Sequence, residues 1–355
     1  MTKAKKSKKV LLIVILSIIG ALLAFLIVCG VILYGRIATM TSASKAGDGL
    51  YKVDYRQNYD LDKVLSAEIN STDKLLSFIS DEFYFGFDFS GNKSEYSCSA
   101  FLTKTPDGKY AVGRNFDHKQ TDALVVHTAP EIGYESMATV ALDMLGAGST
   151  NSTDPLSLGG RLSMLASPYI CVDGVNEKGL SVSILNLKKQ ELHQDSGKPD
   201  IIITAAVRLL LDRAENVDKA VELLGKYDMQ MLEKTTQHLF IADKSGKAVV
   251  VEWTDDKMEV IESNICTNFE LAAANGSYNG LCDRFDTIAD RLAEHPENTT
   301  DEAMEILESV SMTADSYGGT ITQWSCVADL EDFSVKYVAG SYYDDIQEIR
   351  PDDFR

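Results

Sequence analysis

The sequence has few basic side chains outside its first residues. Six of its 34 lysines and arginines precede residue 37, where no acid occurs, so the remainder carries 28 basic against 53 acidic side chains. Nucleic-acid phosphates require basic patches, so this balance argues against a nucleic-acid partner. Zinc-type cysteine and histidine spacing, a phosphate-binding glycine loop and internal repeats are also lacking. We therefore expect no metal, cofactor or nucleic acid.

One apolar run is long enough to cross a bilayer. Residues 10–34 contain no charge, and about 20 apolar residues suffice for a spanning helix. Lysines cluster before this run, and positive charge there keeps that end in the cytoplasm. We expect a cytoplasmic tail at residues 1–9, a transmembrane signal anchor at residues 10–34, and an extracytoplasmic remainder at the cell membrane.

Two other interpretations of this run are weaker. A cleaved signal peptide has an apolar region of only about 7 to 15 residues. Cys29 lies at the depth of a lipid-modified cysteine, but Val28 before it is bulkier than that signal favours. Beyond Cys29 five cysteines remain, and an odd number in an oxidising space leaves at least one free thiol.

Residues 35–97 are predicted to be a tether followed by a helical pro-segment. Apolar residues recur at helical spacing from Leu61 to Ile79, and the polar residues 90–94 break the pattern. At Ser97 the sequence pattern changes from helical spacing to short apolar runs.

From Ser97 onward, short apolar runs broken by glycine and aspartate predict strands. The runs are residues 99–103, 110–113, 124–128, 137–142, 169–172, 180–187, 238–242, 248–253, 259–268, 322–329 and 334–339. Helical patterns fall between them at residues 202–211, 217–224, 281–294 and 301–309. Strands at both ends with helices in blocks predict an α+β domain of antiparallel sheets, spanning residues 98–355.

The first two predicted strands bring a cysteine, an arginine and an aspartate close together. Cys98 opens one strand, and Arg114 and Asp117 end its partner across a turn at Pro106-Asp107-Gly108. A guanidinium favours the charged form of a nearby thiol, which is the nucleophilic form. If Cys98 begins a mature chain, its α-amino group has an ordinary pKa of about 7.7 to 8 and can act as the base. Asp117 would then orient that amine.

These residues resemble the choloylglycine hydrolase and acid amidase group of linear amide C-N hydrolases, in the N-terminal-nucleophile superfamily. Cys98, Arg114 and Asp117 have the spacing of that group's catalytic set, and residues 173–180 and 266–269 are similar to its later motifs. The resemblance covers roughly residues 97 to 340. It implies a four-layer αββα fold and a small-molecule N-acyl amide substrate.

The resemblance also implies further site residues. Asn268 matches the asparagine that supports the oxyanion hole, Asn186 an oxyanion or substrate residue, and Arg284 the late site arginine. Asn186 stands where penicillin-preferring relatives tend to carry tyrosine, which tilts the expectation toward a bile-salt-like substrate.

In one respect the sequence departs from the bile-salt and penicillin acylases, because 97 residues precede its cysteine. Activation must therefore cut the Ser97–Cys98 bond, as related acid amidases do autocatalytically. The cut would shed the enzyme unless the helical segment near residues 60 to 82 stays packed as a small subunit.

Three alternatives stay open at this point. An acyltransferase would use the same nucleophile, and an unprocessed extracellular binding protein would keep the fold without a free amine. A Cys–His enzyme would need one of five histidines, of which His118 follows Asp117 directly but faces the opposite side of its strand. The oligomeric state is left undetermined.

Overall fold

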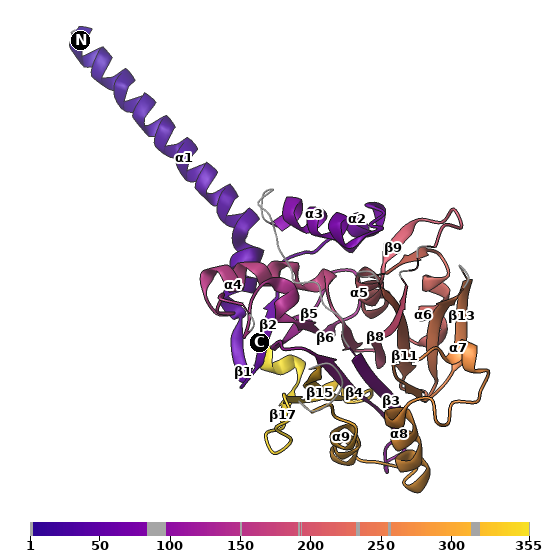
Figure 1. The fold of residues 1–355 in the computed structure, drawn as a ribbon. Coiled ribbons are helices and arrows are strands. Elements are labelled where there is room, and N and C mark those ends of the chain that lie inside the picture. Colours follow the sequence, from indigo (N-terminus) through magenta and orange to yellow (C-terminus); the bar gives the residue numbers. More distant parts are fainter. Residues whose placement is uncertain are drawn as a thin grey trace.

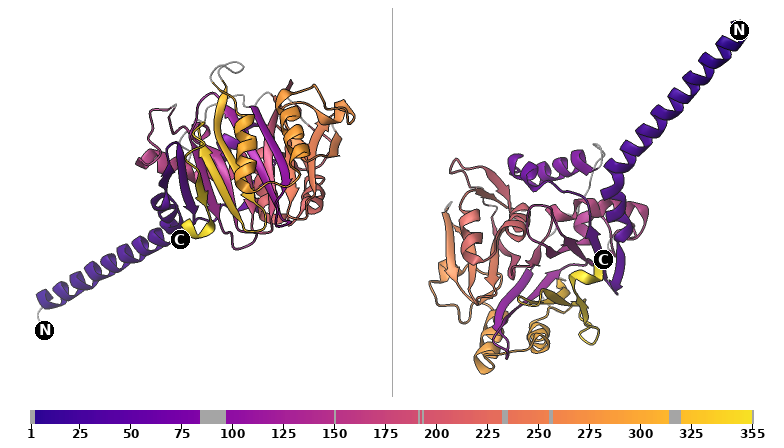
Figure 2. Two further views of the ribbon diagram at one scale, coloured as in Figure 1. Left: turned by 90° about the horizontal axis from the view of Figure 1, so that it is seen from below. Right: turned by 180° about the vertical axis from the view of Figure 1, so that it is seen from behind.

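The computed structural model describes residues 3–83, 97–149, 151–190, 192, 194–231, 235–254, 257–313 and 320–354. The predicted break at residues 90–94 and one of the histidines, His193, lie outside these ranges. Two stacked β-sheets carry helices on their outer faces, and one long helix projects from the domain (Figures 1 and 2).

The first sheet has nine strands in the order β1-β2-β5-β6-β7-β8-β11-β12-β13. All neighbours in it are antiparallel except β2 and β5, which run parallel. Its strands are β1 Ser44–Gly47, β2 Leu50–Tyr55, β5 Ala123–Thr128, β6 Ser136–Ala141, β7 Asp173–Asn176, β8 Leu180–Gln190, β11 Thr235–Asp243, β12 Ala248–Thr254 and β13 Lys257–Glu262.

The second sheet has six antiparallel strands in the order β14-β3-β4-β15-β16-β17. These are β14 Ile265–Cys266, β3 Ser97–Lys104, β4 Tyr110–His118, β15 Ile321–Asp329, β16 Ser334–Ala339 and β17 Gln347–Ile349. The predicted hairpin of β3 and β4 is confirmed, and Gly108 in its turn has φ +85°, which a glycine adopts without strain.

Helices complete a four-layer arrangement. Helices α5 Ile203–Arg213 and α6 Val217–Leu224 contact the nine-stranded sheet, and α8 Asp283–Glu294 and α9 Thr300–Ser309 contact the six-stranded one. Between the sheets, Thr139 on β6 and Tyr337 on β16 share a hydrogen bond of 3.0 Å. The α+β prediction is therefore confirmed.

The remaining short elements are α4 Leu158–Ser163, α7 Leu271–Ala274, the parallel pair β9 Asp200–Ile202 and β10 Asp228–Gln230, and the 3-10 turns Leu142–Leu145, Met164–Tyr169 and Pro351–Phe354.

Two strand predictions are wrong. Residues 169–172 form no strand, because Tyr169 ends a 3-10 helix containing Pro168, and the chain becomes a strand only at Asp173. This run is apolar because it is buried, and burial alone does not distinguish a strand from other structure. The single strand predicted over residues 259–268 is two strands, β13 and β14, which belong to different sheets.

The segment predicted to be a tether is largely part of the domain. Strands β1 and β2 form one edge of the nine-stranded sheet, although both precede Cys98. The predicted helical segment is present as α2 Leu61–Ser66 and α3 Thr72–Phe83. Leu50, Val53 and Tyr55 of β2 are buried in the core, so this part of the segment belongs to the domain and is not a tether.

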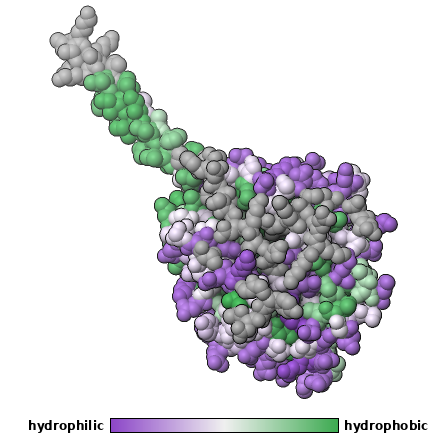
Figure 3. Space-filling model, viewed as in Figure 1, coloured by the Kyte–Doolittle hydropathy of each residue, from purple (hydrophilic) through white to green (hydrophobic). Residues whose placement is uncertain are grey.

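Helix α1, Lys3–Ser42, carries the apolar run. Residues 11–28 have a mean hydropathy of 3.3 and none of this stretch is buried in the domain. Figure 3 shows this apolar surface projecting from the domain, where most of the coloured residues are hydrophilic. By length and composition the helix is able to cross a membrane.

Candidate active site

The β3–β4 register places the predicted nucleophile beside the predicted arginine. Cys98 lies opposite Phe116, and Ala100 lies opposite Arg114. Side chains alternate between the faces of a strand, so Cys98 and Ala100 share one face with Phe116 and Arg114. This face points toward the nine-stranded sheet, and Arg114 forms hydrogen bonds with residues of that sheet.

Arg114 connects the two sheets. Its Nε donates to Asp173 Oδ2 on β7 at 2.5 Å, and its Nη2 donates to the Ile184 carbonyl oxygen on β8 at 3.0 Å. The Arg114 side chain is 1% exposed, so its charge is tolerated because Asp173 pairs with it. Among the described residues Nη1 has no hydrogen-bond partner, which leaves a donor available in the interior.

Burial dominates the electrostatics of Cys98. The thiol is fully buried, and this burial raises its pKa although Arg114 acts in the opposite direction. Asp117 raises the pKa further and Arg284 lowers it. The raised pKa keeps the Cys98 thiol protonated near neutral pH.

Asn268 lies immediately next to Cys98. Its side-chain oxygen accepts hydrogen bonds from the Cys98 backbone nitrogen at 2.8 Å and from Arg284 Nη2 at 2.6 Å. Its amide nitrogen donates to the Asn186 carbonyl oxygen at 2.6 Å. Asn268 follows β14, the neighbour of β3, and this strand pairing brings it to Cys98.

Asp117 is held by Arg284 and by a residue that the sequence did not indicate. Arg284 Nη1 donates to Asp117 Oδ2 at 2.6 Å, and Thr322 Oγ1 donates to Oδ1 at 2.7 Å. Burial raises the pKa of Asp117 despite the neighbouring Arg284. The backbone nitrogen of Cys98 is bonded to Asn268 and not to Asp117, so the orienting role of Asp117 stays a prediction.

All six predicted residues thus meet in one place. Cys98, Asn268, Arg284 and Asp117 form a continuous hydrogen-bonded chain, Asn186 joins it through Asn268, and Arg114 flanks the thiol. The Asn186 side-chain oxygen is buried and has no partner among the described residues. Asp173 and Thr322 complete the set. Asp173 opens the motif noted at residues 173–180, whereas no sequence signal pointed to Thr322.

A second cysteine contacts a histidine. Cys266 Sγ lies 3.4 Å from His238 Nε2, and Glu252 Oε1 lies 2.9 Å from His238 Nδ1. This is not a nucleophilic pair, because Nε2 donates to the Thr267 carbonyl oxygen at 2.8 Å and all three side chains are fully buried. Burial also raises the pKa of Cys266 well above its ordinary value.

The His238–Glu252 pair instead fixes the backbone on either side of Asn268. His238 binds Thr267, and the Glu252 carboxylate accepts hydrogen bonds from the Leu271 and Ala272 backbone nitrogens at 2.8 and 2.9 Å. The histidine considered from the sequence, His118, contacts Asp143 at 2.9 Å.

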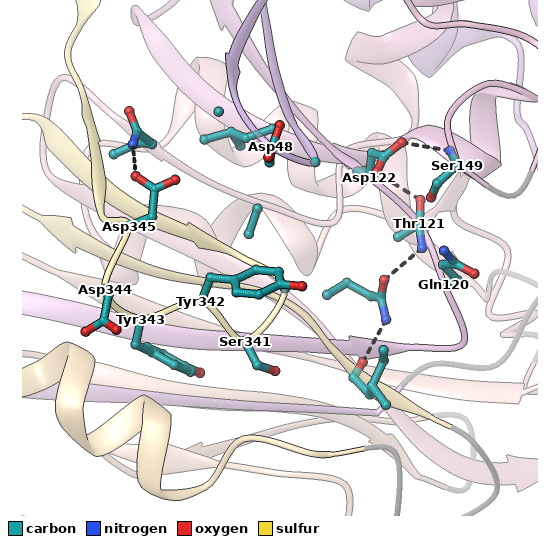
Figure 4. Close-up of a pocket in the computed structure, with 18 of the residues that line it drawn as sticks. Asp48, Gln120, Thr121, Asp122, Ser149, Ser341, Tyr342, Tyr343, Asp344 and Asp345 are labelled. Atoms are coloured by element: carbon teal, nitrogen blue, oxygen red, sulfur yellow. Dashed lines mark hydrogen bonds between the residues drawn. The ribbon is translucent and has the colours of Figure 1, made fainter.

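A cavity of about 960 Å³ lies to one side of this cluster. Asp48, Asp122, Asp344 and Asp345 are among its lining residues, and Figure 4 shows them with Tyr342. Cys98 is not among them. Across the six-stranded sheet Cys98 pairs with Phe116, Phe116 with Trp324, and Trp324 with Ala339, which lines the cavity. Three strand spacings of about 4.8 Å therefore place Cys98 about 14 Å from Ala339.

The described ranges contain no cluster of histidine, cysteine, aspartate or glutamate side chains suited to a metal ion. Cys98, Cys171, Cys266, Cys282 and Cys326 are all free thiols there.

Comparison with known proteins identifies the family. The model of the linear amide C-N hydrolases, choloylglycine hydrolase family, matches residues 98–279. A penicillin V acylase from Pectobacterium atrosepticum is 31% identical over 102 residues, which are 26% of this chain and 27% of the relative. A bile salt hydrolase/transferase from Clostridium perfringens is 26% identical over 205 residues, which are 52% of this chain and 58% of the relative. The matches therefore span less than two thirds of either relative.

Crystal structures of other proteins have a similar fold. The crystal structure of a mutant conjugated bile acid hydrolase from Clostridium perfringens aligns with a TM-score of 0.55 at 18% identity, covering 72% of this chain and 93% of the other. A second variant of the same enzyme gives 0.55 at 19% identity, with the same coverage. These likenesses establish a sheet-rich α+β fold shared with the bile acid hydrolase structures. Because the family model matches more than half of the chain, the chain belongs to the choloylglycine hydrolase family of linear amide C-N hydrolases.

Proposed function

We propose that the chain hydrolyses a linear amide bond of a small N-acyl substrate, with Cys98 as the nucleophile and its own freed α-amino group as the base. One observation carries the proposal. The Cys98 backbone nitrogen is held by Asn268 at 2.8 Å, while Arg114 flanks the thiol on the inner face of the same hairpin.

The first step is removal of the preceding chain. The Cys98 thiol adds to the Ser97 carbonyl carbon, and the Ser97–Cys98 amide rearranges to a thioester that water hydrolyses. The products are a carboxylate on Ser97 and a free α-amine on Cys98. Ser97 lies opposite Asp117 in the β3–β4 register, so the bond to be cut is within the cluster.

Catalysis then uses the new amine. It accepts the thiol proton, the thiolate attacks the substrate carbonyl carbon, and an oxyanion forms. The Asn268 amide nitrogen, with Asn186 beside it, is assigned to stabilise that oxyanion. The ammonium protonates the departing amine, which leaves a thioester on Cys98. Water, deprotonated by the α-amine, releases the acid and regenerates the thiol.

The other residues have supporting roles. Arg114 favours the thiolate because it already lowers the pKa of Cys98 against the effect of burial. Arg284 bridges Asn268 and Asp117 through separate nitrogens and so fixes their separation. Asp117 would orient the α-amine once the cut has freed it.

Substrates are proposed from the relatives and from Asn186. A bile salt hydrolase/transferase and a penicillin V acylase are among the relatives. Asparagine at position 186 favours a bile-salt-like N-acyl amide over penicillin V. Acyl transfer to an amine is the second candidate, since one relative is named as both hydrolase and transferase.

We also propose that α1 crosses the cell membrane and that the domain is extracytoplasmic. Residues 11–28 are apolar and not covered by the domain, and lysines precede them.

The test is the N-terminus of each fragment. The full chain is expressed in membranes as wild type, Cys98→Ala and Cys98→Ser, and its fragments are analysed by intact mass and end-sequencing. We expect a fragment that begins at Cys98 in the wild type, none in Cys98→Ala, and at most slow cutting in Cys98→Ser. A wild-type chain that stays whole would defeat the α-amine base and favour an unprocessed binding protein.

A further inference from the structure

The chain upstream of Cys98 is built into the domain that the proposed cut would separate it from. We propose that residues 1–97, the N-terminal chain, stay bound after the cut as a noncovalent subunit and hold residues 98–355, the catalytic chain, at the membrane. The inference rests on the proposed function for the cut itself, and on the contacts below for retention.

The first contact is a sheet pairing. β2 runs parallel to β5 through six consecutive residue pairs, from Leu50 opposite Ala123 to Tyr55 opposite Thr128. The Ala123 backbone nitrogen also donates to the Gly49 carbonyl oxygen at 2.9 Å. Every residue of β5 is buried. Loss of β2 would turn this wholly buried strand into an exposed sheet edge, which soluble proteins avoid.

The second contact is a buried polar cluster shared by the two chains. Tyr59 Oη, from the N-terminal chain, lies 2.9 and 2.8 Å from the two Asp212 carboxylate oxygens on α5. Asp212 pairs with Arg208 at 2.6 Å, and the Arg208 guanidinium lies over the Tyr59 ring at 5.5 Å. Departure of Tyr59 would remove both a hydrogen bond and a ring from an ion pair that is almost fully buried.

Aromatic and apolar packing surrounds that cluster. The Tyr169 ring of the catalytic chain packs edge-on against Tyr59 and Phe78 of the N-terminal chain, with centroids 6.2 and 5.9 Å apart. Tyr55 Oη donates to the Leu165 carbonyl oxygen at 2.7 Å. The N-terminal chain also buries in the shared core Leu50, Val53, Leu61, Val64, Leu65, Ile69, Leu75 and Ile79. Much of this surface would become exposed on dissociation.

The membrane helix itself is tied to the catalytic chain. Arg161 Nη1, on α4, donates to the carbonyl oxygens of Met40 and Ala43 at 2.6 and 2.9 Å. Arg161 therefore holds the end of α1 and the residue between α1 and β1 directly. None of these contacts passes through the Ser97–Cys98 bond, so cutting that bond leaves all of them in place.

The experiment separates retention from self-cleavage. In full-length Cys98→Ala, residues 86–91 are replaced by the recognition sequence of a site-specific protease. Membranes carrying this chain are treated until denaturing electrophoresis shows complete cutting, washed in concentrated salt and sedimented. We expect the catalytic chain to sediment with the membranes, as the uncut chain does. Release of the catalytic chain into the supernatant would overturn the inference.

Variants in the N-terminal chain locate the retaining surface. Val53→Asp places a carboxylate in the core, and we expect the cut catalytic chain to be released while the uncut chain still sediments. Ser66→Asp, at an exposed position on α2 of the same chain, is the matched control and should retain it. Tyr59→Phe, which preserves the ring, should give release intermediate between the two. Equal retention in all three would contradict the assigned surface.

The wild type is fractionated in parallel. A wild-type chain that is not cut, together with retention in the protease-cut chain, would defeat the proposed function and leave the subunit contact standing. Self-cutting followed by release would do the reverse.

Discussion

The Asn268 side-chain oxygen accepts a hydrogen bond from the Cys98 backbone nitrogen at 2.8 Å, across 170 positions in sequence. The same oxygen accepts a bond from Arg284, and Arg284 also binds Asp117. The atom that would become the catalytic base therefore has a fixed partner before any cut. Asn268 is the point where the predicted nucleophile, arginine and aspartate are joined.

Replacement of Asn268 by alanine should disable the site without unfolding the domain. The change removes the acceptor of the Cys98 nitrogen and the amide assigned to the oxyanion. Loss of one oxyanion donor lowers kcat by about 10² to 10³-fold. Amide turnover by fully cut protein measures the effect. Asn264→Ala, an exposed asparagine just before β14, is the control, and equal losses in the two variants would contradict the assignment.

Arg114 should matter for stability as well as for activity. Arg114→Met leaves Asp173 buried without its partner, and breaking such a pair costs about 3 to 5 kcal/mol of unfolding free energy. Asp173→Leu in the same chain should recover much of that loss but none of the activity. Denaturant unfolding provides the measurement. Arg213→Met, which breaks an exposed pair with Asp62, should cost about 0 to 1 kcal/mol.

The reactivity of Cys98 should depend on the cut. In the uncut chain the thiol is fully buried and burial raises its pKa, so we expect little alkylation by iodoacetamide near neutral pH. Cys282, which is partly exposed, should be labelled in cut and uncut molecules alike and serves as the internal control. Peptide mass mapping separates the two sites. Rapid labelling of Cys98 in uncut chains would contradict the buried protonated thiol.

His127 should make stability depend on pH. Burial opposes protonation, but hydrogen bonds to Asp54 and Glu135, both at 2.8 Å, outweigh it and raise the pKa of His127. A raised folded-state pKa stabilises the fold below the unfolded value of about 6.5, and this contribution is lost as the pH rises through the folded pKa. Thermal midpoints should fall over that window in the wild type. In His127→Gln the decrease should be smaller, and an identical decrease would contradict the assignment.

The β3–β4 hairpin and helices α5 and α6 could be predicted because their signals are local. Pro106-Asp107-Gly108 marks the hairpin turn, and Asn216 caps α6 by accepting from the Lys219 backbone nitrogen. The six site residues were predicted through a family resemblance, and only Cys98, Arg114 and Asp117 follow from the hairpin itself. The later residues reach the site through β14 and α8, whose positions no local pattern specifies.

Strand β2 shows why the rest was not predictable. Lys52 and Asp54 interrupt its short apolar pattern, and its parallel partner β5 begins at Ala123. Such a pairing is set by tertiary packing and leaves little periodicity in the sequence. The Cys266–His238 contact was missed for a similar reason, because its residues lie on strands of two different sheets.

The proposed mechanism requires that Cys98, as the first residue of a chain, carries the acyl group. Cut protein is incubated with a conjugated bile salt or penicillin V and quenched in acid, and its peptides are mapped by mass. We predict an acyl adduct on the peptide that begins at Cys98, and no turnover in Cys98→Ala. Turnover that persists in Cys98→Ala, or an adduct on any other residue, would contradict the account.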